Sequence, residues 1–384
     1  MDFLSEVLKI IEGATKANAS MASNYAGLLA DKLEQAGEFK QAKMIRERLM
    51  RAPQALIGAQ KAGGSTTMSS LPVDIDSRLN TVDISYPKIC HSELYLPSGI
   101  NARVEEFITN VQRFDEFVKA EAALPNRLLV YGVPGTGKTL LAKYIASKLN
   151  IPLLTVRCDT LMSSLLGQTS KNLRQVFDYA SQYPCVLFLD EFDALAGARG
   201  NERDIGELQR VVISLLQNID AAADNMIVIA STNHEQLLDP AVWRRFSFRI
   251  PMPLPDQTQR ELLWKNRLKS MYSNELDLNE LSRKSEGMSG AVIEQVCMDA
   301  RRDAVINGDK FVSSPKLYRR LYLAQALLES ITLSTYEDEI RWLRIKDQKT
   351  FSIRVLAELY GISTRAISNL IKESLSYEQK GLSV

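Results

Sequence analysis

The sequence has few of the residues that build metal centres or disulfide frameworks. Its 384 residues include four cysteines and two histidines. No C-x-x-C pair occurs among the cysteines, which are Cys90, Cys158, Cys185 and Cys297, and the two histidines are His91 and His234. Scattered soft ligands of this kind argue against a structural zinc site and against a disulfide-stabilised fold.

An excess of charge of one sign and long apolar runs are also lacking. The 47 basic and 46 acidic residues give a formal net charge of +1, so any nucleic-acid binding has to come from a local patch. No apolar run approaches the roughly 20 residues of a membrane helix, and the N-terminus does not resemble a signal peptide. We therefore expect a soluble, cytoplasmic protein with an ordinary globular composition, 45% hydrophobic and 24% charged.

The most specific motif is the stretch VYGVPGTGKTLLAKYIASKL, residues 130–149. It matches the phosphate-binding (Walker A) pattern G-x-x-x-x-G-K-[ST], between an apolar strand and an amphipathic helix. The glycines let backbone N–H groups surround phosphate oxygens, Lys138 supplies a cation, and Thr139 offers a hydroxyl to Mg²⁺. A plain glycine turn, the alternative, needs neither side chain. The predicted nucleotide-binding residues are Gly132, Val133, Pro134, Gly135, Thr136, Gly137, Lys138, Thr139 and Leu140.

Two carboxylates follow the apolar run in CVLFLDEFDAL, residues 185–195. Ligands in open α/β folds sit at the carboxyl ends of the strands, so we expect Asp190 to hold Mg²⁺ through water in a Walker B role. Glu191 is then placed to orient and deprotonate the attacking water. The alternative is that these acids only cap the strand. We expect a structural role for Asp193.

Three further polar residues follow the next predicted strand. Asn233, at its end, provides an amide that can hold the attacking water without competing as a base. Arg244 and Arg245 come eleven and twelve residues later. If they face out of their own subunit, they can stabilise charge on a neighbour's γ-phosphate. Alternatively, they are solvated surface arginines.

The ordered set GVPGTGKT, VLFLDEFDAL, STN, LDPAVWRRF and EGMSGAVIEQV resembles the AAA clade of the AAA+ ATPases over roughly residues 90–310. The resemblance implies an ATPase that uses ATP and Mg²⁺. It also implies a homo-oligomeric ring, usually a hexamer, in which Arg244 and Arg245 complete a neighbour's site. It places Ser289, Gly290 and Ala291 at the second sensor, with Gly290 and Ala291 contacting the nucleotide through their backbone. Read without the family, this segment is a turn followed by a helix start.

One loop departs from the family pattern. Many members carry an aromatic residue before an apolar residue and a glycine in the loop that faces the pore and grips polypeptide. Here the corresponding residues are Leu165, Leu166 and Gly167. Leucine contacts apolar side chains but lacks the flat surface of an aromatic ring, so the resemblance to polypeptide-threading members is weaker.

The pattern along the chain predicts an α/β fold with a P-loop NTPase parallel sheet, helices on both faces, a small all-α lid and helical N- and C-terminal segments. Strands are expected at 128–132, 153–158, 185–191, 226–232 and 246–252. The helical N-terminal stretch has an apolar stripe (Phe3, Leu4, Val7, Leu8 and Ile11) and a turn at Gly37. The expected domains are a helical module (1–52), a flexible linker (53–80), the ATPase domain (81–255), the lid (256–330) and a C-terminal helical segment (331–384).

The C-terminal segment contains a helix-turn-helix pattern at residues 352–374. Its small contact residue, turn glycine and packing positions are Ala357, Gly361, Ile362, Ile367 and Leu370. A polar face suited to base edges and phosphates is formed by Arg365, Ser368, Asn369 and Lys372. Residues 341–372 hold seven basic and two acidic side chains. The alternative is a bundle element used for packing or protein contacts.

Three functions share this catalytic site, because the fold and the hydrolysis do not name the target. The first is an ATP-driven ring that remodels or activates a protein partner, engaged through residues 1–52. The second is a DNA-associated ATPase that binds duplex DNA through residues 341–374. The third is a slow nucleotide switch that activates a separate effector such as a protease, as stand-alone bacterial ATPases of this resemblance often do. We predict the first.

Overall fold

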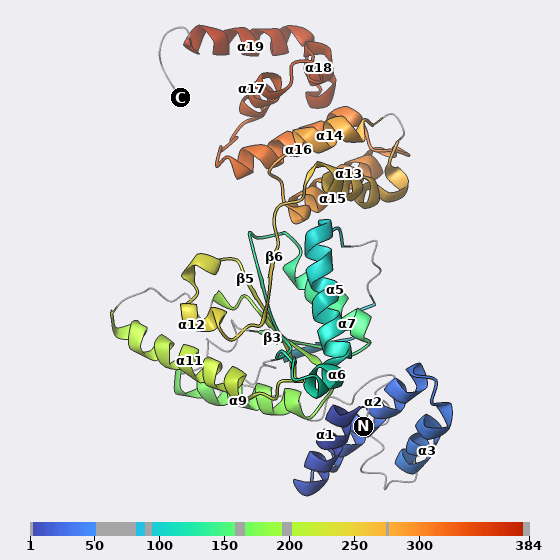
Figure 1. Ribbon diagram of the computed structural model, residues 1–384. Helices are drawn as coiled ribbons and strands as arrows, with labels where there is room; N and C mark the ends of the chain where they lie inside the picture. The colour runs from blue at the N-terminus through green and yellow to red at the C-terminus, as the bar shows by residue number, and fades with distance from the viewer. Residues whose placement is uncertain are drawn as a thin grey trace. The chain divides into compact units, whose positions relative to one another are not determined.

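The computed structural model describes residues 3–50, 82–88, 94–157, 166–193, 202–273 and 276–378. They belong to two compact units, Met1–Pro253 and Leu254–Val384 (Figure 1). The predicted linker at 53–80 and the pore residue Leu165 lie outside the described residues, and the division into five domains stays a prediction. Among the described residues, no helix combines the length and apolar composition needed to cross a membrane.

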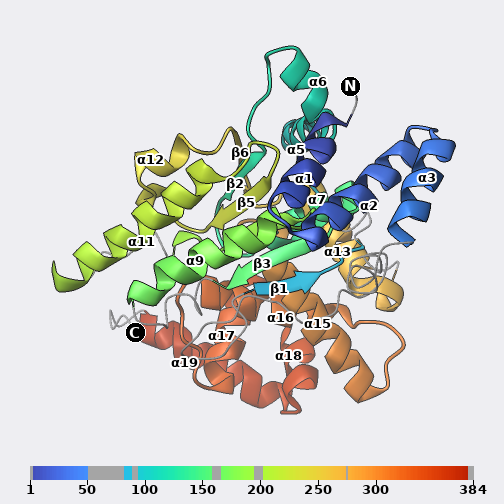
Figure 2. The same cartoon turned by 90° about the horizontal axis from the view of Figure 1, so that it is seen from below.

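A six-stranded sheet forms the centre of the first unit, in the order β1-β3-β4-β5-β2-β6. The strands are β1 Val82–Ser85, β2 Arg127–Tyr131, β3 Leu153–Arg157, β4 Val186–Asp190, β5 Ile227–Thr232 and β6 Phe248–Pro251. The pairings among β2 to β6 are parallel, as predicted. At one edge β1 pairs antiparallel with β3 (Figure 2), which adds an antiparallel edge strand to the predicted parallel sheet. Four residues, VDIS, are too short for a periodic pattern to reveal a strand.

Helices cover both faces of this sheet, as predicted (Figure 1). Consecutive residues of a strand point to opposite faces. In β2, Leu128 and Val130 therefore pack with α5 (Ser98–Gln112) and α7 (Lys138–Leu149). Leu129 packs in the other layer, with α9 (Leu166–Ser181) and α11 (Glu202–Ala221). The short elements are α6 Phe114–Lys119, η2 Glu235–Leu237 and α12 Pro240–Trp243.

Three helices form the N-terminal module: α1 Leu4–Thr15, α2 Ala19–Gln35 and α3 Phe39–Met50. The predicted turn at Gly37 lies between α2 and α3, with a φ of 83° that suits glycine. The apolar stripe predicted for α1 is not buried as a whole, because Leu8 and Ile11 are more than half exposed. Glu6 is buried instead and pairs with Lys32 of α2.

The N-terminal helices contact the α/β layers through polar groups. The Ser5 N–H donates to both carboxylate oxygens of Asp115 at 3.2 Å. The Tyr25 hydroxyl donates to the Ser181 carbonyl at 3.3 Å, where α9 ends. The last carbonyls of a helix have no partner within it, so α2 satisfies groups that α9 leaves open.

The second unit is all-helical, as predicted for the lid and the C-terminal segment (Figure 1). Its elements are α13 Gln257–Leu268, η3 Lys269–Met271, α14 Leu278–Lys284, α15 Gly290–Asn307, α16 Ser314–Leu328, α17 Tyr336–Lys346, α18 Ile353–Tyr360 and α19 Thr364–Glu378. Trp264 of α13 is completely buried, and its indole N–H donates to the Ser285 hydroxyl at 2.9 Å. A buried indole that keeps a hydrogen-bond partner stabilises this core.

Candidate nucleotide-binding site

The glycine-rich loop joins β2 to α7 at the carboxyl edge of the sheet. Gly132, Gly135 and Gly137 have φ values of 144°, 77° and 96°, a region that other residues rarely adopt. A Cβ at Gly132 would lie 2.2 Å from the Met252 carbonyl oxygen. Close approach of β6 therefore requires glycine at this position, and the loop keeps the path expected of a phosphate cradle.

Lys138 is the first residue of α7, and only 8% of it is exposed. Its ammonium donates to the carbonyls of Gly132 at 2.7 Å and Val133 at 2.9 Å. Burial lowers its pKa, against an opposing contribution from nearby carboxylates. Neutral carbonyls compensate a buried ammonium only in part, so an anionic phosphate at this loop is a stronger acceptor for the same protons.

Thr139 and Asp190 are brought together across two elements. The Thr139 hydroxyl donates to Asp190 Oδ2 at 2.9 Å. The other oxygen, Oδ1, accepts from the Ser231 hydroxyl and, at 3.1 Å, from the Glu191 N–H. Because β4 and β5 are neighbours, Ser231 orients the carboxylate from the adjacent strand. Ser231 was not among the predicted site residues, although a hydroxyl at the end of a buried strand was an available signal.

This oxygen pair fits a magnesium ion. Mg²⁺ binds through one or two carboxylates together with waters and substrate phosphates, and it does not require a cage made of protein ligands. The described residues contain no cluster of three or more His, Cys, Asp or Glu side chains that would form such a cage. Thr139 and Asp190 supply the donor set that nucleotide-bound Mg²⁺ needs.

Glu191 follows Asp190 and is exposed. Its backbone has a φ of 53°, an uncommon conformation for a non-glycine residue, and one that recurs at functional sites. Its carboxylate has no hydrogen bond or ion pair within the described part of the chain. Asn233 is half-buried, and its N–H donates to Asp193 at 3.2 Å. Asp193 thus holds the strand end that presents Asn233.

The two predicted finger arginines differ. Arg244, at the end of α12, is exposed. Arg245 is partly buried, with its Nε 3.0 Å from both carboxylate oxygens of Asp220, and it also donates to the Ala241 carbonyl at 2.8 Å. Asp220, on α11, belongs to no motif, so the sequence carried no signal for this ion pair.

Gly290 and Ala291 open α15 in the second unit. Ser289 caps this helix, with its hydroxyl oxygen 3.5 Å from the Val292 N. This is the helix start that the sequence predicts. The contact of Gly290 and Ala291 with nucleotide stays a prediction.

Comparisons with known proteins identify the family of this chain. Residues 128–254 match the model of the family described as ATPase family associated with various cellular activities (AAA). An uncharacterized AAA family ATPase, y4kL, from Sinorhizobium fredii is 34% identical over 281 residues, 73% of this chain and 83% of that protein.

Two named relatives are similarly distant. A proteasome-activating nucleotidase from Saccharolobus islandicus is 33% identical over 270 residues, covering 66% of this chain and 67% of its own. A cell division cycle protein 48 homolog from Archaeoglobus fulgidus is 32% identical over 278 residues, 70% of this chain and 37% of that longer protein. Together with the glycine loop and the Thr139–Asp190 contact, the match to y4kL shows that this chain belongs to the AAA family of ATPases.

Proposed function

We propose that this chain hydrolyses ATP with Mg²⁺ and uses the energy to remodel or activate a protein partner. The observation that carries the proposal is the contact between Thr139 and Asp190 at the end of a glycine loop containing Lys138. In this proposal Thr139 and Asp190 would hold Mg²⁺, which would supply positive charge to the phosphates of the nucleotide. Lys138 then neutralises phosphate charge, and the loop N–H groups hold the oxygens in place.

Glu191 is the proposed base. It follows the metal-binding carboxylate directly, and its own carboxylate has no partner among the described residues, so it is available to a water molecule. Asn233 holds that water from the neighbouring strand end. In-line attack then transfers a water proton to Glu191 while the bond to the leaving ADP oxygen breaks.

The proposed assembly is a homo-oligomeric ring, a hexamer by family resemblance. The exposed position of Arg244 suits a residue that acts on a neighbouring subunit. Arg245 joins it once nucleotide competes with Asp220 for its guanidinium. Arginine suits this task because it stays charged and donates to two oxygens at once.

A protein target is favoured by two observations. One relative bears a name that refers to proteasome activation. In addition, the N-terminal module exposes large apolar side chains at Leu8, Ile11, Phe39, Met44 and Met50. Five exposed apolar side chains on one small module support a protein-binding role, because large exposed apolar patches mark interaction sites. The module is therefore our proposed point of target engagement.

The test is ATP turnover of the full chain measured alone, with an unfolded protein, and with duplex DNA. We expect stimulation by the unfolded protein, with the Lys138→Ala variant as the inactive control. Stimulation by DNA alone would replace the proposal with the DNA-associated alternative. Turnover that neither ligand changes would favour the nucleotide switch with a dedicated effector.

The DNA-associated alternative is favoured by one specific observation, the arrangement of α18 and α19 around Gly361. It concerns the second unit alone and is compatible with the same ATPase site.

A further inference from the structure

We propose that the outward face of α19 binds the major groove of duplex DNA. The face is defined by three exposed residues, Arg365, Asn369 and Lys372. This inference goes beyond the proposed protein-remodelling function and does not rest on it.

The first observation is the geometry of the turn between α18 and α19. Gly361 has a φ of 66°, and the Ile362 N–H donates to the Ala357 carbonyl at 3.1 Å, which ends α18. The Ser363 hydroxyl then accepts from the Ala366 N–H at 3.2 Å, which caps the start of α19. Two capped helices joined by a short glycine turn are the helix-turn-helix arrangement.

A core holds this arrangement in one conformation. α19 contacts both α17 and α18. The completely buried side chains of the three helices and their connection are Ile340, Leu343, Phe351, Leu356 and Ile367. Because Ile367 anchors the inner side of α19, the residues on the other side of that helix remain at the surface.

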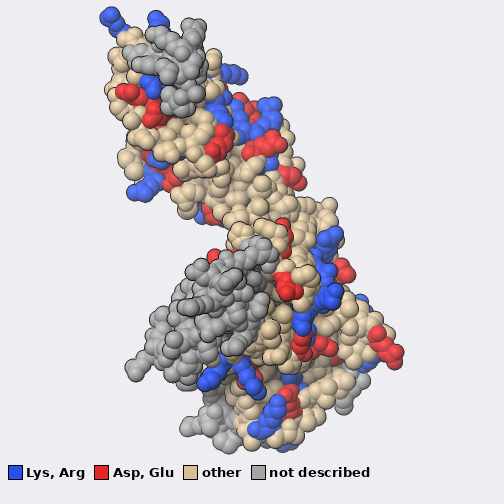
Figure 3. Space-filling view, turned by 90° about the vertical axis from the view of Figure 1, so that its left-hand side faces the viewer, with Lys and Arg blue, Asp and Glu red and all other residues tan. Residues whose placement is uncertain are grey.

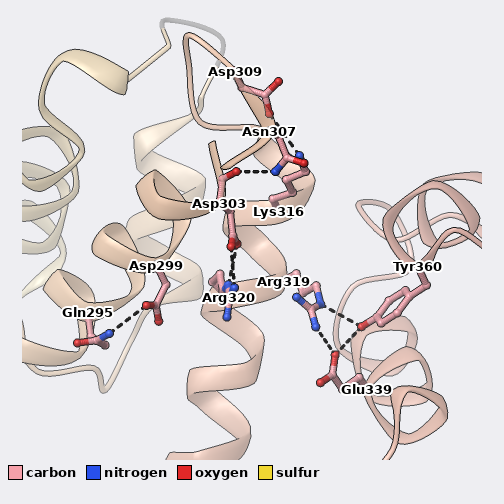
Figure 4. Close-up of polar contacts among 10 residues, drawn as sticks. All are labelled: Gln295, Asp299, Asp303, Asn307, Asp309, Lys316, Arg319, Arg320, Glu339 and Tyr360. Atoms are coloured by element: carbon pink, nitrogen blue, oxygen red, sulfur yellow. Dashed lines mark hydrogen bonds and ion pairs between the residues drawn. The ribbon is translucent and has the colours of Figure 1, made fainter. Parts of the chain in front are cut away.

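Polar contacts fix α17 and α18 to the lid helix α16. Arg319 of α16 donates to Glu339 at 2.6 Å and to the Tyr360 hydroxyl at 3.1 Å, and Tyr360 in turn donates to Glu339 at 2.8 Å (Figure 4). The Trp342 indole N–H donates to the Tyr322 carbonyl at 2.8 Å. These contacts engage the inner faces of α17 and α18 and leave the outer face of α19 uninvolved.

The charged side chains of residues 341–372 fall into two groups, those with a partner in the protein and those without one. Three of the seven basic side chains have protein partners: Arg341 lies 3.7 Å from Asp338, Arg344 donates to two carbonyls, and Lys346 pairs with Glu329. The exposed cations of this segment that have no partner among the described residues are Lys349, Arg354, Arg365 and Lys372. Of the two acidic residues, Asp347 is buried against Lys284, which leaves Glu358 exposed.

The free charge is therefore a local excess of cations and not a uniformly basic surface. The face of the molecule in Figure 3 likewise shows basic and acidic side chains interspersed. A few phosphate contacts at one helix fit this distribution better than wrapping of DNA around a basic surface.

The dimensions and chemistry of the α19 face suit the major groove. A 15-residue helix is about 22 Å long at 1.5 Å per residue, and the major groove of B-DNA, roughly 12 Å wide, admits one helix. Arg365, Asn369 and Lys372 follow one another at i, i+4 and i+7, so they share one stripe. Arginine reads guanine, asparagine reads adenine, and lysine neutralises phosphate.

The test uses the full chain, with and without ATP, and a labelled mixed-sequence DNA duplex whose binding is measured by fluorescence anisotropy from 50 to 200 mM salt. A duplex RNA of the same sequence is the second probe, because its A-form major groove is too deep and narrow for a helix. The double variant Arg365→Ala/Lys372→Ala is compared with Arg302→Ala/Lys310→Ala, which removes the same charge from exposed positions of the same unit.

We expect salt-sensitive binding of DNA, weaker binding of RNA, and wild-type behaviour of the Arg302/Lys310 control. Removing Arg365 and Lys372 removes two cations that displace counterions when DNA binds, so the loss of affinity between 50 and 200 mM salt should become about tenfold smaller than in the wild type. Basal ATP turnover and thermal stability should not change.

Three outcomes would overturn the proposal: no salt-sensitive retention of duplex DNA by the wild type, equal or tighter binding of the RNA duplex, or equal losses in the two double variants. A wild type that fails to bind DNA but forms a complex with an acidic protein through Arg365 would assign this face to protein contacts. Because DNA binding is read without turnover, its failure is distinguishable from failure of the ATPase proposal.

Discussion

The carboxyl edge of the sheet and the C-terminal helices use polar side chains in opposite ways. At the sheet edge, Glu191 is exposed and has no partner among the described residues, and Lys138 donates to neutral carbonyls of its own loop. In the C-terminal helices, Lys284 pairs with Asp347, and Arg319 with Glu339. The first arrangement holds charged groups in readiness for a ligand, whereas the second uses charged groups to fix helices against one another.

The difference predicts how each region responds to substitution. Removing the Glu191 carboxylate at the sheet edge should abolish turnover and leave stability almost unchanged, since it has no hydrogen bond or ion pair among the described residues. Removing a charge in the C-terminal helices should lower stability and leave turnover almost unchanged. Variants of Arg245, Glu191, Gly132 and Asp347 test this contrast, and the expected effect decreases in that order.

The largest effect is expected for Arg245→Ala. An arginine finger contributes about 10³- to 10⁵-fold to hydrolysis, so turnover should fall by this order while nucleotide affinity persists. In mixed rings with Lys138→Ala subunits, some interfaces combine an intact Lys138 with an intact Arg245, and partial activity should return. Demonstrably mixed rings without recovery would contradict a finger acting on the neighbouring subunit.

The ion pair of Arg245 provides the matched control. Asp220→Asn removes the partner but keeps the guanidinium, so this variant should retain most of its turnover. If Asp220→Asn loses as much activity as Arg245→Ala, the pair acts by holding α11 and α12 together. Arg244, exposed beside it, would then be the sole candidate for the finger.

Glu191→Gln should bind ATP but lose at least about 100-fold in turnover, because the phosphate and metal contacts remain while the base is removed. Its melting temperature should match that of the wild type, because the Glu191 carboxylate makes no hydrogen bond or ion pair with a described residue. Retention of more than about a tenth of wild-type turnover would assign the base to another group. A large loss of stability would contradict the contrast drawn between the two regions.

The sequence predicted those parts of the molecule that local patterns determine. The five parallel strands follow from apolar runs. Two motifs placed Thr139 and Asp190 at the same metal site, although β5 separates the strands that precede them. The pairs Asp220–Arg245 and Ser231–Asp190 join residues 25 and 41 positions apart. Such partners are selected by packing of distant segments, which no local spacing encodes.

The same limit applies to the terminal regions. Helical periodicity predicted α1, but it did not predict that Glu6 would be buried and Leu8 exposed, because that outcome depends on which segment covers the helix. For residues 341–372, counting charges predicted a strongly basic segment. The structure reduces this excess, because Arg341, Arg344 and Lys346 are engaged within the protein.

Gly132→Ala tests a position at the sheet edge where close packing of the backbone leaves no room for a side chain. The new Cβ would lie 2.2 Å from the Met252 carbonyl oxygen, and the φ of 144° is unfavourable for alanine. Steric overlap and backbone strain together should lower the free energy of unfolding by about 2–4 kcal/mol. Gly99→Ala in α5, with no atom within 4 Å of its new Cβ, is the control and should change stability by less than about 0.5 kcal/mol in urea unfolding. Equal effects would show that β6 can move away from the loop.

The smallest effect is expected for Asp347→Asn. Asp347 is buried after α17, where it pairs with Lys284 and accepts hydrogen bonds from the Thr350 N–H at 2.9 Å and the Tyr322 hydroxyl at 3.3 Å. Burial alone would raise its pKa, but the ion pair with Lys284 and the hydrogen bonds from Thr350 lower the pKa to about 2. A shift of this size corresponds to at most about 2.4 kcal/mol, and partial solvation reduces the expected loss at pH 7 to about 1–2 kcal/mol.

The pH dependence separates the charge of Asp347 from its shape. A carboxyl whose pKa is lower in the folded chain stabilises the fold above the ordinary carboxyl pKa near 3.8, and this contribution disappears as the pH falls toward 2. The difference in unfolding free energy between the wild type and Asp347→Asn should therefore be constant from pH 7 to about 5 and shrink from about 4 to 2. Tryptophan fluorescence during urea unfolding measures it, because Trp342 lies in α17. A difference that persists unchanged at pH 2.5 would mean that Asp347 acts through hydrogen-bond geometry and not through its charge, while turnover at pH 7 should equal that of the wild type in either case.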